Sequence, residues 1–548
     1  MTMARRITVY GIFFVILVVF IFVVLFLIRM WFPDGLGGLF NFGQANRNNF
    51  TRYYGPDVEA ILQHRHIMID AGNTDVEIRI RKPGQFEMGE DGVGTMVIRE
   101  DARNNRSWLE WTQVFVDNDT FTNQLFYRVV IHEGSTAFQR RPLLVLNLSE
   151  DDFDIDNPFF RPYSFIFNMG AGSVTFSFDP DVQQTLENVL LGTIEIGSGA
   201  TGIYRFPAPR TVAGHTFTVE IDNLVINESD IVVSAAHVPI RESLVINSRY
   251  GNFTVGDVGD SITVANGNYI ILHAGGIAGD VNVNTTMGRV SASGIVSGHV
   301  TMSTWSGSLS VLRIQGDLTF STTFNGTATV TYLVGNVNFT STDRGLLSLS
   351  QIQGFAIVNA HQSAITLGGT RAVDGMYGDV TVVNNYGSTV VRFATAAISP
   401  ITHITGVDSH VTVTGVRGQI FVGLTGTTGR GNISASFHEI SASTNILENL
   451  GLGNINISLI TTLGANPPFM PFHLRVENTE QARDRTGWAV HAPWMDAPVA
   501  GNTGIGNIID NYNRPPPYHG RLWPVQNPTN TSHILTARTS NAVELRAV

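Results

Sequence analysis

Six polar residues that each follow a repeated glycine are the first candidates for chemistry in this sequence. If the repeats stack in register, these residues lie about 4.8 Å apart, and a column of carboxylates could then bind Ca²⁺. Only Asp260 and Asp280 are consecutive carboxylates, however, because His299 and Asn336 interrupt the column, and the calcium-binding nonapeptide G-G-x-G-x-D is absent. The pattern therefore favours independent turn-forming side chains, and we expect neither a metal site nor a bound cofactor. The six residues are Asp260, Asp280, His299, Asp317, Asn336 and Asp379.

The histidines and acids of the repeat region are weak candidates for catalysis. Solenoid enzymes that cleave polysaccharides need acids and bases clustered on one outward face. Here charged residues such as the pair Asp343–Arg344 and the single Glu439 are isolated. The histidines share no ligand or triad spacing (His273, His299, His361, His403 and His410). We therefore predict no catalytic residue and a protein that is not an enzyme, with a polysaccharide-active enzyme as the alternative on fold analogy.

The outward-facing residues of the repeats are neutral and able to form hydrogen bonds. A flat face rich in hydroxyl groups can bind glycans, a second solenoid or ice, although ice binding requires a more uniform threonine array. The simpler alternative is that these residues only keep an exposed sheet face soluble. Two sets recur at equivalent positions, Asn282, Thr301, Thr319 and Asn338 in one strand and Ser291, Ser310, Thr329 and Ser348 in the next.

One repeat is longer than its neighbours and contains the segment GGTRAVDGMYG at 368–378. Long loops often contain binding residues. Arg371, Asp374, Met376 and Tyr377 are therefore the best candidates for ligand contact in the repeat region. The alternative is a tolerated loop insertion without a function.

These candidates must be positioned by an internal repeat of about 19 residues. One signal is a glycine, a polar residue and then alternating apolar and polar residues, as in GDVNV at Gly279. A second signal of the same kind falls between these, as in GRVSA at Gly288. The glycines that open the first signal are 20, 19, 18, 19, 19 and 24 residues apart (Gly259, Gly279, Gly298, Gly316, Gly335, Gly354 and Gly378).

Each unit therefore contains two short strands, each with an inward and an outward face. Val281 and Val283, for example, alternate with Asn282. A single unit cannot bury its inward face, whereas a stack of units buries it continuously. We therefore predict an all-β fold, a parallel β-solenoid, with right-handed winding by analogy with parallel crossover connections. We expect the glycines to adopt positive φ at the turns, because glycine adopts this conformation at little cost.

The period also divides the chain into regions. The repeat is regular at 246–464 and degenerate at 61–245, where a more charged stretch at 81–163 is predicted to be an inserted β subdomain that caps the solenoid. Residues 33–60 have few apolar groups, which predicts a flexible stalk. Residues 465–548 are rich in proline and asparagine, which predicts an extended C-terminal tail.

The N-terminal region, 1–32, contains an unbroken apolar run from Ile7 to Ile28. At about 1.5 Å per residue, this run is long enough to cross the hydrocarbon core of a bilayer as a helix. A cleaved signal peptide, the main alternative, has a shorter core and a small-residue cleavage site. Arg5 and Arg6 precede the run, so we predict a single-pass protein of the cell membrane with a cytoplasmic N-terminus and all residues after Trp31 outside.

Composition restricts the partners further. The formal net charge is −11, and the cationic residues are scattered, which argues against nucleic acid as a partner. The chain has no cysteine, which excludes disulfides, zinc-thiolate sites and cysteine catalysis. The expected partners are the lipid bilayer through residues 7–28, and envelope glycans or other surface proteins.

The repeat phrases GDVNV, GRVSA, GHVTM, GSLSV and GDLTF resemble the bacterial Gly-Asp-Val repeat family of candidate adhesins, which is related to the head domains of autotransporter adhesins. The resemblance covers about residues 65–80 and 165–460, and the stretch at 81–163 and the tail depart from it. It implies a β-solenoid behind a membrane anchor and supplies no catalytic residues. We therefore expect an adhesin-like binding or scaffold protein, with a polysaccharide-active enzyme or a purely structural envelope component as alternatives.

Overall fold

The computed structural model of the chain describes most of the repeat region and parts of both ends. The predicted membrane anchor at 7–28 lies outside the described residues, and within them no helix is both long and apolar enough to span a bilayer. The described residues are 48–54, 65–86, 88–89, 92–93, 96–102, 109–118, 125–133, 143–156, 160–197, 199–212, 215–227, 230–235, 237–371, 373–426, 431–438, 444–450, 453–459, 473–478, 490–491, 508–510, 534–539 and 543–547.

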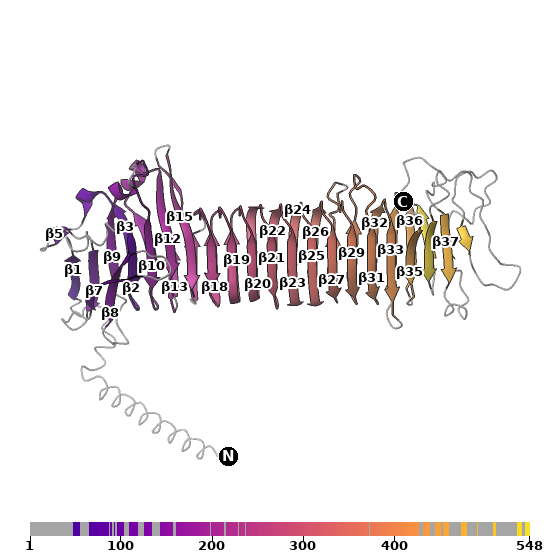
Figure 1. Cartoon of the computed structure of the whole chain (residues 1–548), viewed down its shortest axis with the longest axis horizontal. Coiled ribbons are helices and arrows are strands. Elements are labelled where there is room, and N and C mark those ends of the chain that lie inside the picture. Colours follow the sequence, from indigo (N-terminus) through magenta and orange to yellow (C-terminus); the bar gives the residue numbers. More distant parts are fainter. Residues whose placement is uncertain are drawn as a thin grey trace, which may run out of the picture.

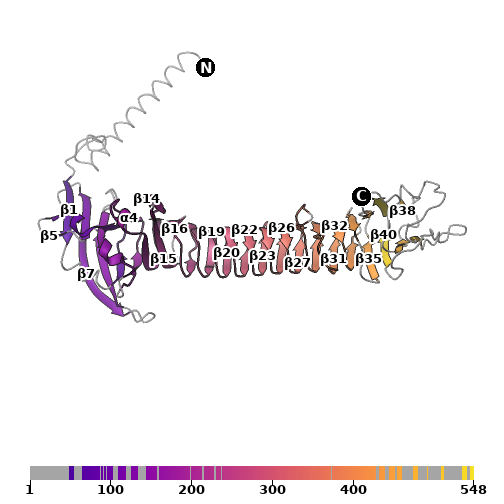
Figure 2. The same cartoon turned by 90° about the horizontal axis from the view of Figure 1, so that it is seen from above.

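The described part of the chain is an all-β rod of stacked coils, which confirms the predicted parallel β-solenoid (Figures 1 and 2). Each regular coil contributes one strand to face 1 and one strand to face 2, and within these coils neighbouring strands on each face are parallel. Pairing joins each strand to the equivalent strand of the next coil, for example Val300–Thr304 to Leu318–Phe324. The coil is therefore the unit that the 19-residue period predicts.

The strands of face 1, in their order along the rod, are β7 (Leu109–Asn118), β8 (Leu125–Glu133), β2 (His66–Asp70), β10 (Tyr163–Asn168), β12 (Asn188–Ile196), β15 (His215–Asn227), β17 (Leu244–Asn247), the first parts of β19 (Ile262–Ala274) and β20 (Val281–Val296), β21 (Val300–Thr304), β23 (Leu318–Phe324), β25 (Val337–Asp343), β27 (Ala356–His361), β29 (Val380–Asn385), β31 (Thr402–Val407), β33 (Ile420–Thr425), β35 (Thr444–Asn449), β40 (Ile534–Thr539), β37 (His473–Asn478) and β39 (Ile508–Asp510).

The strands of face 2, in the same direction, are β1 (Asn48–Tyr54), β6 (Met96–Ala102), β9 (Leu143–Ser149), β3 (Asp75–Arg81), β11 (Val174–Phe178), β13 (Thr201–Arg205), β16 (Asp230–Ala235), β18 (Tyr250–Val255), the last parts of β19 and β20, β22 (Ser308–Ile314), β24 (Thr327–Leu333), β26 (Leu346–Ile352), β28 (Ala364–Leu367), β30 (Ser388–Arg392), β32 (His410–Val416), β34 (Ile433–Phe437), β36 (Ile455–Leu459), β41 (Val543–Ala547) and β38 (Val490–His491). Short elements outside the two faces are β4 (Met88–Gly89), β5 (Gly92–Val93), β14 (Arg210–Val212), the 3-10 turns η1 (Pro83–Gln85) and η2 (Glu150–Phe153), and helix α4 (Val182–Thr185).

A narrow third face, which the two-strand prediction did not include, closes each coil. Isolated parallel bridges join Ile277 to Val296, and Met376 to both Ile352 and Phe393. These side chains are almost completely buried. The cross-section therefore has three sides, and face 3 adds one apolar residue per coil to the core.

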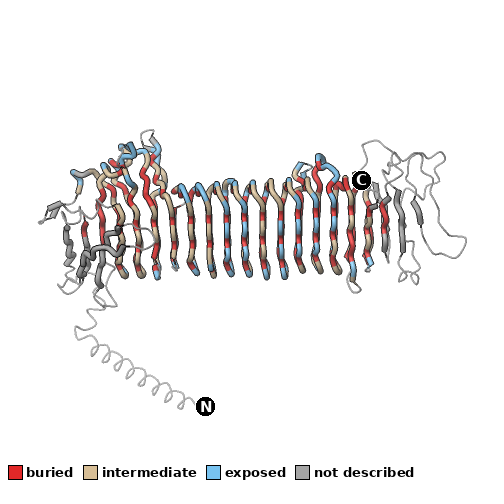
Figure 3. Tube along the Cα trace, in the orientation of Figure 1, coloured by how far each residue is buried: buried red, intermediate tan, exposed pale blue. Residues whose placement is uncertain are grey.

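The core is one continuous column along the axis of the rod. Inward and outward residues alternate, as in the burial pattern of Val300–Thr304, and Figure 3 shows buried residues in bands that repeat from coil to coil. Phe320 and Phe339, which occupy equivalent positions, stack with their ring centroids 5.8 Å apart. Continuous burial of this kind stabilises a stack although no single coil could fold alone.

The repeat glycines do not adopt positive φ, so that part of the prediction is wrong. A Cβ atom at Gly316 would lie 2.5 Å from the backbone oxygen of Gly298, one coil before, and a Cβ atom at Gly335 would overlap the oxygen of Gly316. Glycine is needed here because the backbones of successive coils nearly touch. Positive φ occurs instead at the corner between face 1 and face 2, at non-glycine residues that include Asn266, Asn325, Arg344, Gln362, Tyr386 and Asp408.

The described strands of the stretch predicted as an insertion, 81–163, form one further coil at the N-terminal end of the rod and a cap over it. Strand β8 pairs in parallel with β2, and β9 pairs in parallel with β3. The opposite edges of β2 and β3 pair with β10 and β11, so β2 and β3 lie inside the stack and the coil of β8 and β9 lies outside them. Strands β7 and β6 then pair antiparallel with β8 and β9 and cover that end. Strand β1 lies within the predicted stalk, 33–60, and pairs antiparallel with β6, so residues 48–54 belong to the cap.

Part of the predicted C-terminal tail, 465–548, continues the solenoid. Strands β40 and β41 pair in parallel with β35 and β36, and Leu535 and Ala537 are buried. Residues 534–539 and 543–547 therefore belong to the stack rather than to an extended tail. The sequence did not reveal this strand because its alternating segment, ILTART, is short and the residues around it are rich in proline and asparagine.

The contact between glycine backbones yields a first prediction. Gly335→Ala should lower the free energy of unfolding by about 1–3 kcal/mol, because the added methyl group must push two coils apart. Gly276→Ala is the matched control, because its Cβ atom would lie no closer than 3.4 Å to any neighbour. Urea denaturation of the two variants measures the difference, and equal effects would contradict the proposed close approach.

Candidate functional site

The polar residues that follow the repeat glycines, here named the turn column, bond to the next coil from Asp280 onward, whereas the Asp260 carboxylate accepts a hydrogen bond from Ser243 of the preceding coil at 3.2 Å. The Asp280 carboxylate accepts a hydrogen bond from the backbone N–H of His299 at 2.7 Å, and Asp317 accepts one from the N–H of Asn336 at 2.7 Å. His299 Nδ1 accepts from the N–H of Asp317 at 3.0 Å, and the Asn336 amide oxygen accepts from Phe355 at 3.0 Å. The side chains therefore do not act independently, as the sequence suggested, but link each coil to the next.

This arrangement explains why Asp, Asn and His can replace one another in the column. Carboxylate oxygen, amide oxygen and imidazole Nδ1 can each accept one hydrogen bond from a backbone N–H group. Asp379, directly after the longer coil, makes the equivalent bond to the N–H of Ile401 at 2.7 Å. Among the residues that the structure describes, no three His, Asp or Glu side chains lie close enough together to hold a metal ion.

The two predicted rows of outward residues are confirmed in register. In row A, on face 1, Asn282 pairs with Thr301, Thr301 with Thr319, and Thr319 with Asn338. Row B, on face 2, follows the same rule (Ser291, Ser310, Thr329 and Ser348). A second face 1 row runs beside row A (Asn284, Ser303, Ser321, Thr340 and Asn359). The rod therefore presents neutral hydrogen-bonding groups at the spacing of its coils.

The four candidate residues of the longer coil, at 368–378, differ in burial and in their contacts. Arg371 is exposed and lies 3.8 Å from the Asp374 carboxylate, and the Tyr377 hydroxyl donates to the backbone oxygen of Val373 at 3.2 Å. Met376 is fully buried on face 3, where it fills the position between Ile352 and Phe393. The structure therefore assigns Met376 to the core rather than to the surface, and the extra residues form a protrusion that leaves the core column intact.

A pocket of about 700 Å³ lies over face 2. Its lining includes His273, Ser291, Pro209 and His237. His273 Nδ1 lies 2.5 Å from the Ser291 hydroxyl. Ser291 is in the middle of β20, which pairs with β19 on one side and β22 on the other, so its neighbouring backbone N–H groups are engaged in strand pairing. The backbone N–H groups beside Ser291 are therefore not available as oxyanion-stabilising donors of the kind that acyl transfer often uses.

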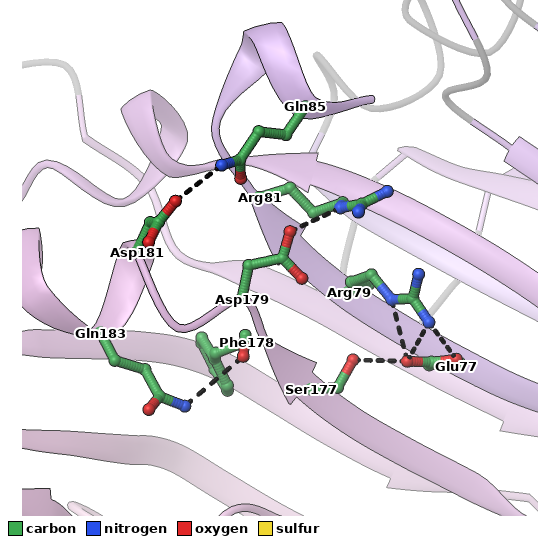
Figure 4. Close-up of polar contacts among 9 residues, drawn as sticks. All are labelled: Glu77, Arg79, Arg81, Gln85, Ser177, Phe178, Asp179, Asp181 and Gln183. Atoms are coloured by element: carbon green, nitrogen blue, oxygen red, sulfur yellow. Dashed lines mark hydrogen bonds and ion pairs between the residues drawn. The ribbon is translucent and has the colours of Figure 1, made fainter. Parts of the chain in front are cut away.

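A charged cluster at the N-terminal end of the rod is made of mutually paired side chains (Figure 4). Arg79 bonds to Glu77 at 2.9 Å, and Ser177 on the neighbouring strand donates to the same carboxylate at 2.6 Å. Arg81 forms an ion pair with Asp179 at 2.7 Å. Glu77 and Asp179 therefore each have a cationic partner, Asp181 accepts a hydrogen bond from the Gln85 amide at 2.8 Å, and the Ser177 bond joins β3 to β11.

A second polar cluster at this end of the rod contains the buried hydroxyl group of Tyr163. Its hydroxyl donates to the Asp152 carboxylate at 3.0 Å, and Arg65 pairs with the same carboxylate at 2.7 Å. Burial, assisted by the Asp152 charge, raises the pKa of the Tyr163 hydroxyl, so the group stays protonated and keeps its role as a donor. This triad lies at the junction of η2 with β10 and has a structural role.

The corner between face 1 and face 2 has exposed aromatic residues that sequence reasoning missed. Trp305 is 48% exposed and Tyr386 54% exposed, whereas the phenylalanines of the strands are largely buried. Trp305 directly follows Thr304, the last inward residue of its face 1 strand, at the position that Thr286 has in the preceding coil. Tyr386 lies one residue further along, two residues after the buried Asn384, and has positive φ like Arg344. Alignment of the coils at these two corner positions would have identified them, because most of the other residues there are polar.

Beside Trp305 lies a pocket of about 460 Å³. Its lining comes from successive coils and has no charged side chain (Asn266, Gly267, Asn284, Thr285, Thr286, Ser303, Thr304, Trp305 and Thr323). Hydroxyl and amide groups beside one exposed indole can bind a ligand that is itself both polar and apolar.

Comparison of the chain with protein-family models, with curated proteins and with solved structures finds no match. The resemblance to the Gly-Asp-Val repeat family therefore stays a prediction. The function has to be argued from the geometry of the rod itself.

The turn column yields a second prediction. Asp317→Ala should lower the free energy of unfolding by about 1 kcal/mol, because the Asn336 N–H loses its acceptor, and Asp317→Asn should retain most of the stability. Added Ca²⁺ and added chelator should leave the melting temperature of the unmodified chain unchanged, because these carboxylates already bind backbone groups. A large rise in melting temperature with Ca²⁺ would contradict this account.

Proposed function

We propose that the chain is an adhesin-like surface protein, in which the solenoid is a rigid rod that binds an extended carbohydrate polymer. The proposal includes a single-pass membrane anchor at 7–28, an extracytoplasmic solenoid and right-handed winding. The observation on which it depends is the pair of neutral rows on face 1, where one row starts at Asn282 and the other at Asn284.

Rows of this kind suit a polymer better than a small ligand. Each row repeats the same type of group at intervals of about 4.8 Å, so a polymer along the rod can form one weak hydrogen bond after another. A single such bond contributes only about 0.5–1.5 kcal/mol, but linked contacts act together. Because the coils share one continuous core, the rows are preorganised, and binding requires little ordering of the protein.

The charge of face 1 supports a neutral partner over an ionic one. Between Asn282 and Thr381, row A and the row beside it contain only Asn, Ser and Thr together with the apolar Ile357 and Val383. Arg344, at the corner, lies 3.8 Å from the Asp343 carboxylate, which balances its charge. A surface of this type has hydrogen-bonding groups that match hydroxyl and amide groups of glycans.

A glycan array and calorimetry with the full chain in detergent test the proposal. The wild-type chain should bind neutral polysaccharides, and the double variant Thr301→Glu with Asn338→Glu should weaken that binding about tenfold, because it places charge in the middle of row A. Gln315→Glu with Gln351→Glu, beside face 3, is the matched control and should bind normally. If the wild-type chain binds no glycan but copurifies with other envelope proteins, a structural role replaces this proposal.

A further inference from the structure

Trp305 is held rigidly at the corner although half of its side chain is exposed. Its ring stacks on that of Phe324, one coil further along, with centroids 5.4 Å apart and an angle of 24° between the planes. The Arg344 guanidinium lies over the Phe324 ring at 5.7 Å and extends the stack to a third coil. Because such stacks restrict ring motion, the indole is presented in one fixed orientation.

The backbone beneath the indole is also fixed. The carbonyl oxygen of Trp305 accepts a hydrogen bond from the N–H of Phe324 at 2.6 Å and faces the hydroxyl of Thr322 at 3.4 Å. Thr304, buried directly before it, donates to the backbone oxygen of Thr286 at 3.0 Å. Buried hydroxyl groups thus anchor this corner to the coils on both sides.

The free side of the indole faces the polar pocket. Phe324 stacks on the indole from the next coil. Most of the pocket lining comes from the coil of Trp305 and the two preceding coils, with Asn266, Asn284 and Thr286 among it, and Thr323 of the next coil completes it. The pocket lining therefore combines amide and hydroxyl groups with one indole.

We infer that this corner pocket binds one ring of a neutral polysaccharide, with Trp305 as the stacking platform; the inference rests on the proposed function and gives it a location. A pyranose ring has an apolar face of C–H groups and an edge of hydroxyl groups. The partly positive C–H groups are attracted to the negative face of an indole, and the hydroxyl groups can bond to Asn284 and Ser303 at the same time. The volume of about 460 Å³ accommodates one or two such rings.

Other occupants fit the site less well. The pocket lining contains no charged residue, so an anionic ligand would lose its hydration without gaining a cationic partner. A second copy of the chain needs about 800 Å² of complementary surface on each partner, and a single indole among hydroxyl groups does not offer a broad apolar patch.

The same corner offers a second contact further along the rod. Tyr386 lies four coils beyond Trp305. Backbone hydrogen bonds at the corner join each of these coils to the next (Phe324 to Trp305, Asn325 to Asp343, Arg344 to His361 and Gln362 to Asn385). Its ring packs edge-on against His361, with centroids 5.4 Å apart. At about 4.8 Å per coil, the two aromatic residues are about 19 Å apart along the rod. A polysaccharide that follows the corner can therefore contact both.

Calorimetry with neutral β-linked oligosaccharides and the full chain tests the inference. Trp305→Ala should weaken binding about tenfold for both disaccharides and longer oligosaccharides, and Trp305→Tyr should restore most of the affinity. Tyr386→Ala should weaken binding only of oligosaccharides long enough to reach both residues. Circular dichroism and the melting temperature verify that the variants are folded.

The outcomes separate this inference from the proposed function. If glycans bind, and Trp305→Ala binds as well as the wild type while the row A variant does not, the corner pocket is ruled out but the proposed function stands. If the wild-type chain binds no glycan, both fail. If Trp305→Ala instead abolishes self-association in light scattering without any effect on glycan binding, the corner is a contact between copies and the inference is wrong.

Discussion

Hydrogen bonding between the backbones of successive coils determines the rest of this structure. The strands of each face pair in parallel at the usual distance, and this distance is reached at the turns only because residues such as Gly316 and Gly335 have no side chain. The Asp and Asn residues that follow these glycines then accept a backbone N–H group of the next coil. Stacking is thus stabilised by strand pairing, by a continuous apolar core and by a side-chain bond at the turn.

The functional surfaces are direct consequences of that stacking. Once the register is set, every outward position becomes a straight row, so the chemistry of a single repeat is multiplied along the rod. The repeat can also vary in length without a break in the row. In the 24-residue coil, the extra residues protrude near Arg371, whereas Met376 still fills its place in the core. The corner residue Trp305 can likewise differ from its counterparts in other coils, because its side chain is not part of the core.

Much of the regular solenoid could be predicted from the sequence, because its period and its apolar alternation are local properties. Rows A and B, the parallel stacking and the inward residues all follow from that alternation. The reason for the glycines could not be found in this way, since a close approach between coils is a contact between residues far apart in the sequence. The same is true of the cap, where β8 and β9 join the stack out of sequence order. The aromatic corner was missed because the repeat signals begin at glycines, and Trp305 lies between two of them.

A distance measurement tests the central claim, the common register of the coils, most directly. The chain has no cysteine, so Thr263→Cys and Thr381→Cys can each be spin-labelled without background. These residues occupy row A six coils apart, through Asn282, Thr301, Thr319, Asn338 and Ile357. At about 4.8 Å per coil, pulsed electron paramagnetic resonance should give a narrow distance distribution centred at about 29 Å. A broad distribution, or a mean far from this value, would contradict the stacked register and with it the rows on which the proposed binding depends.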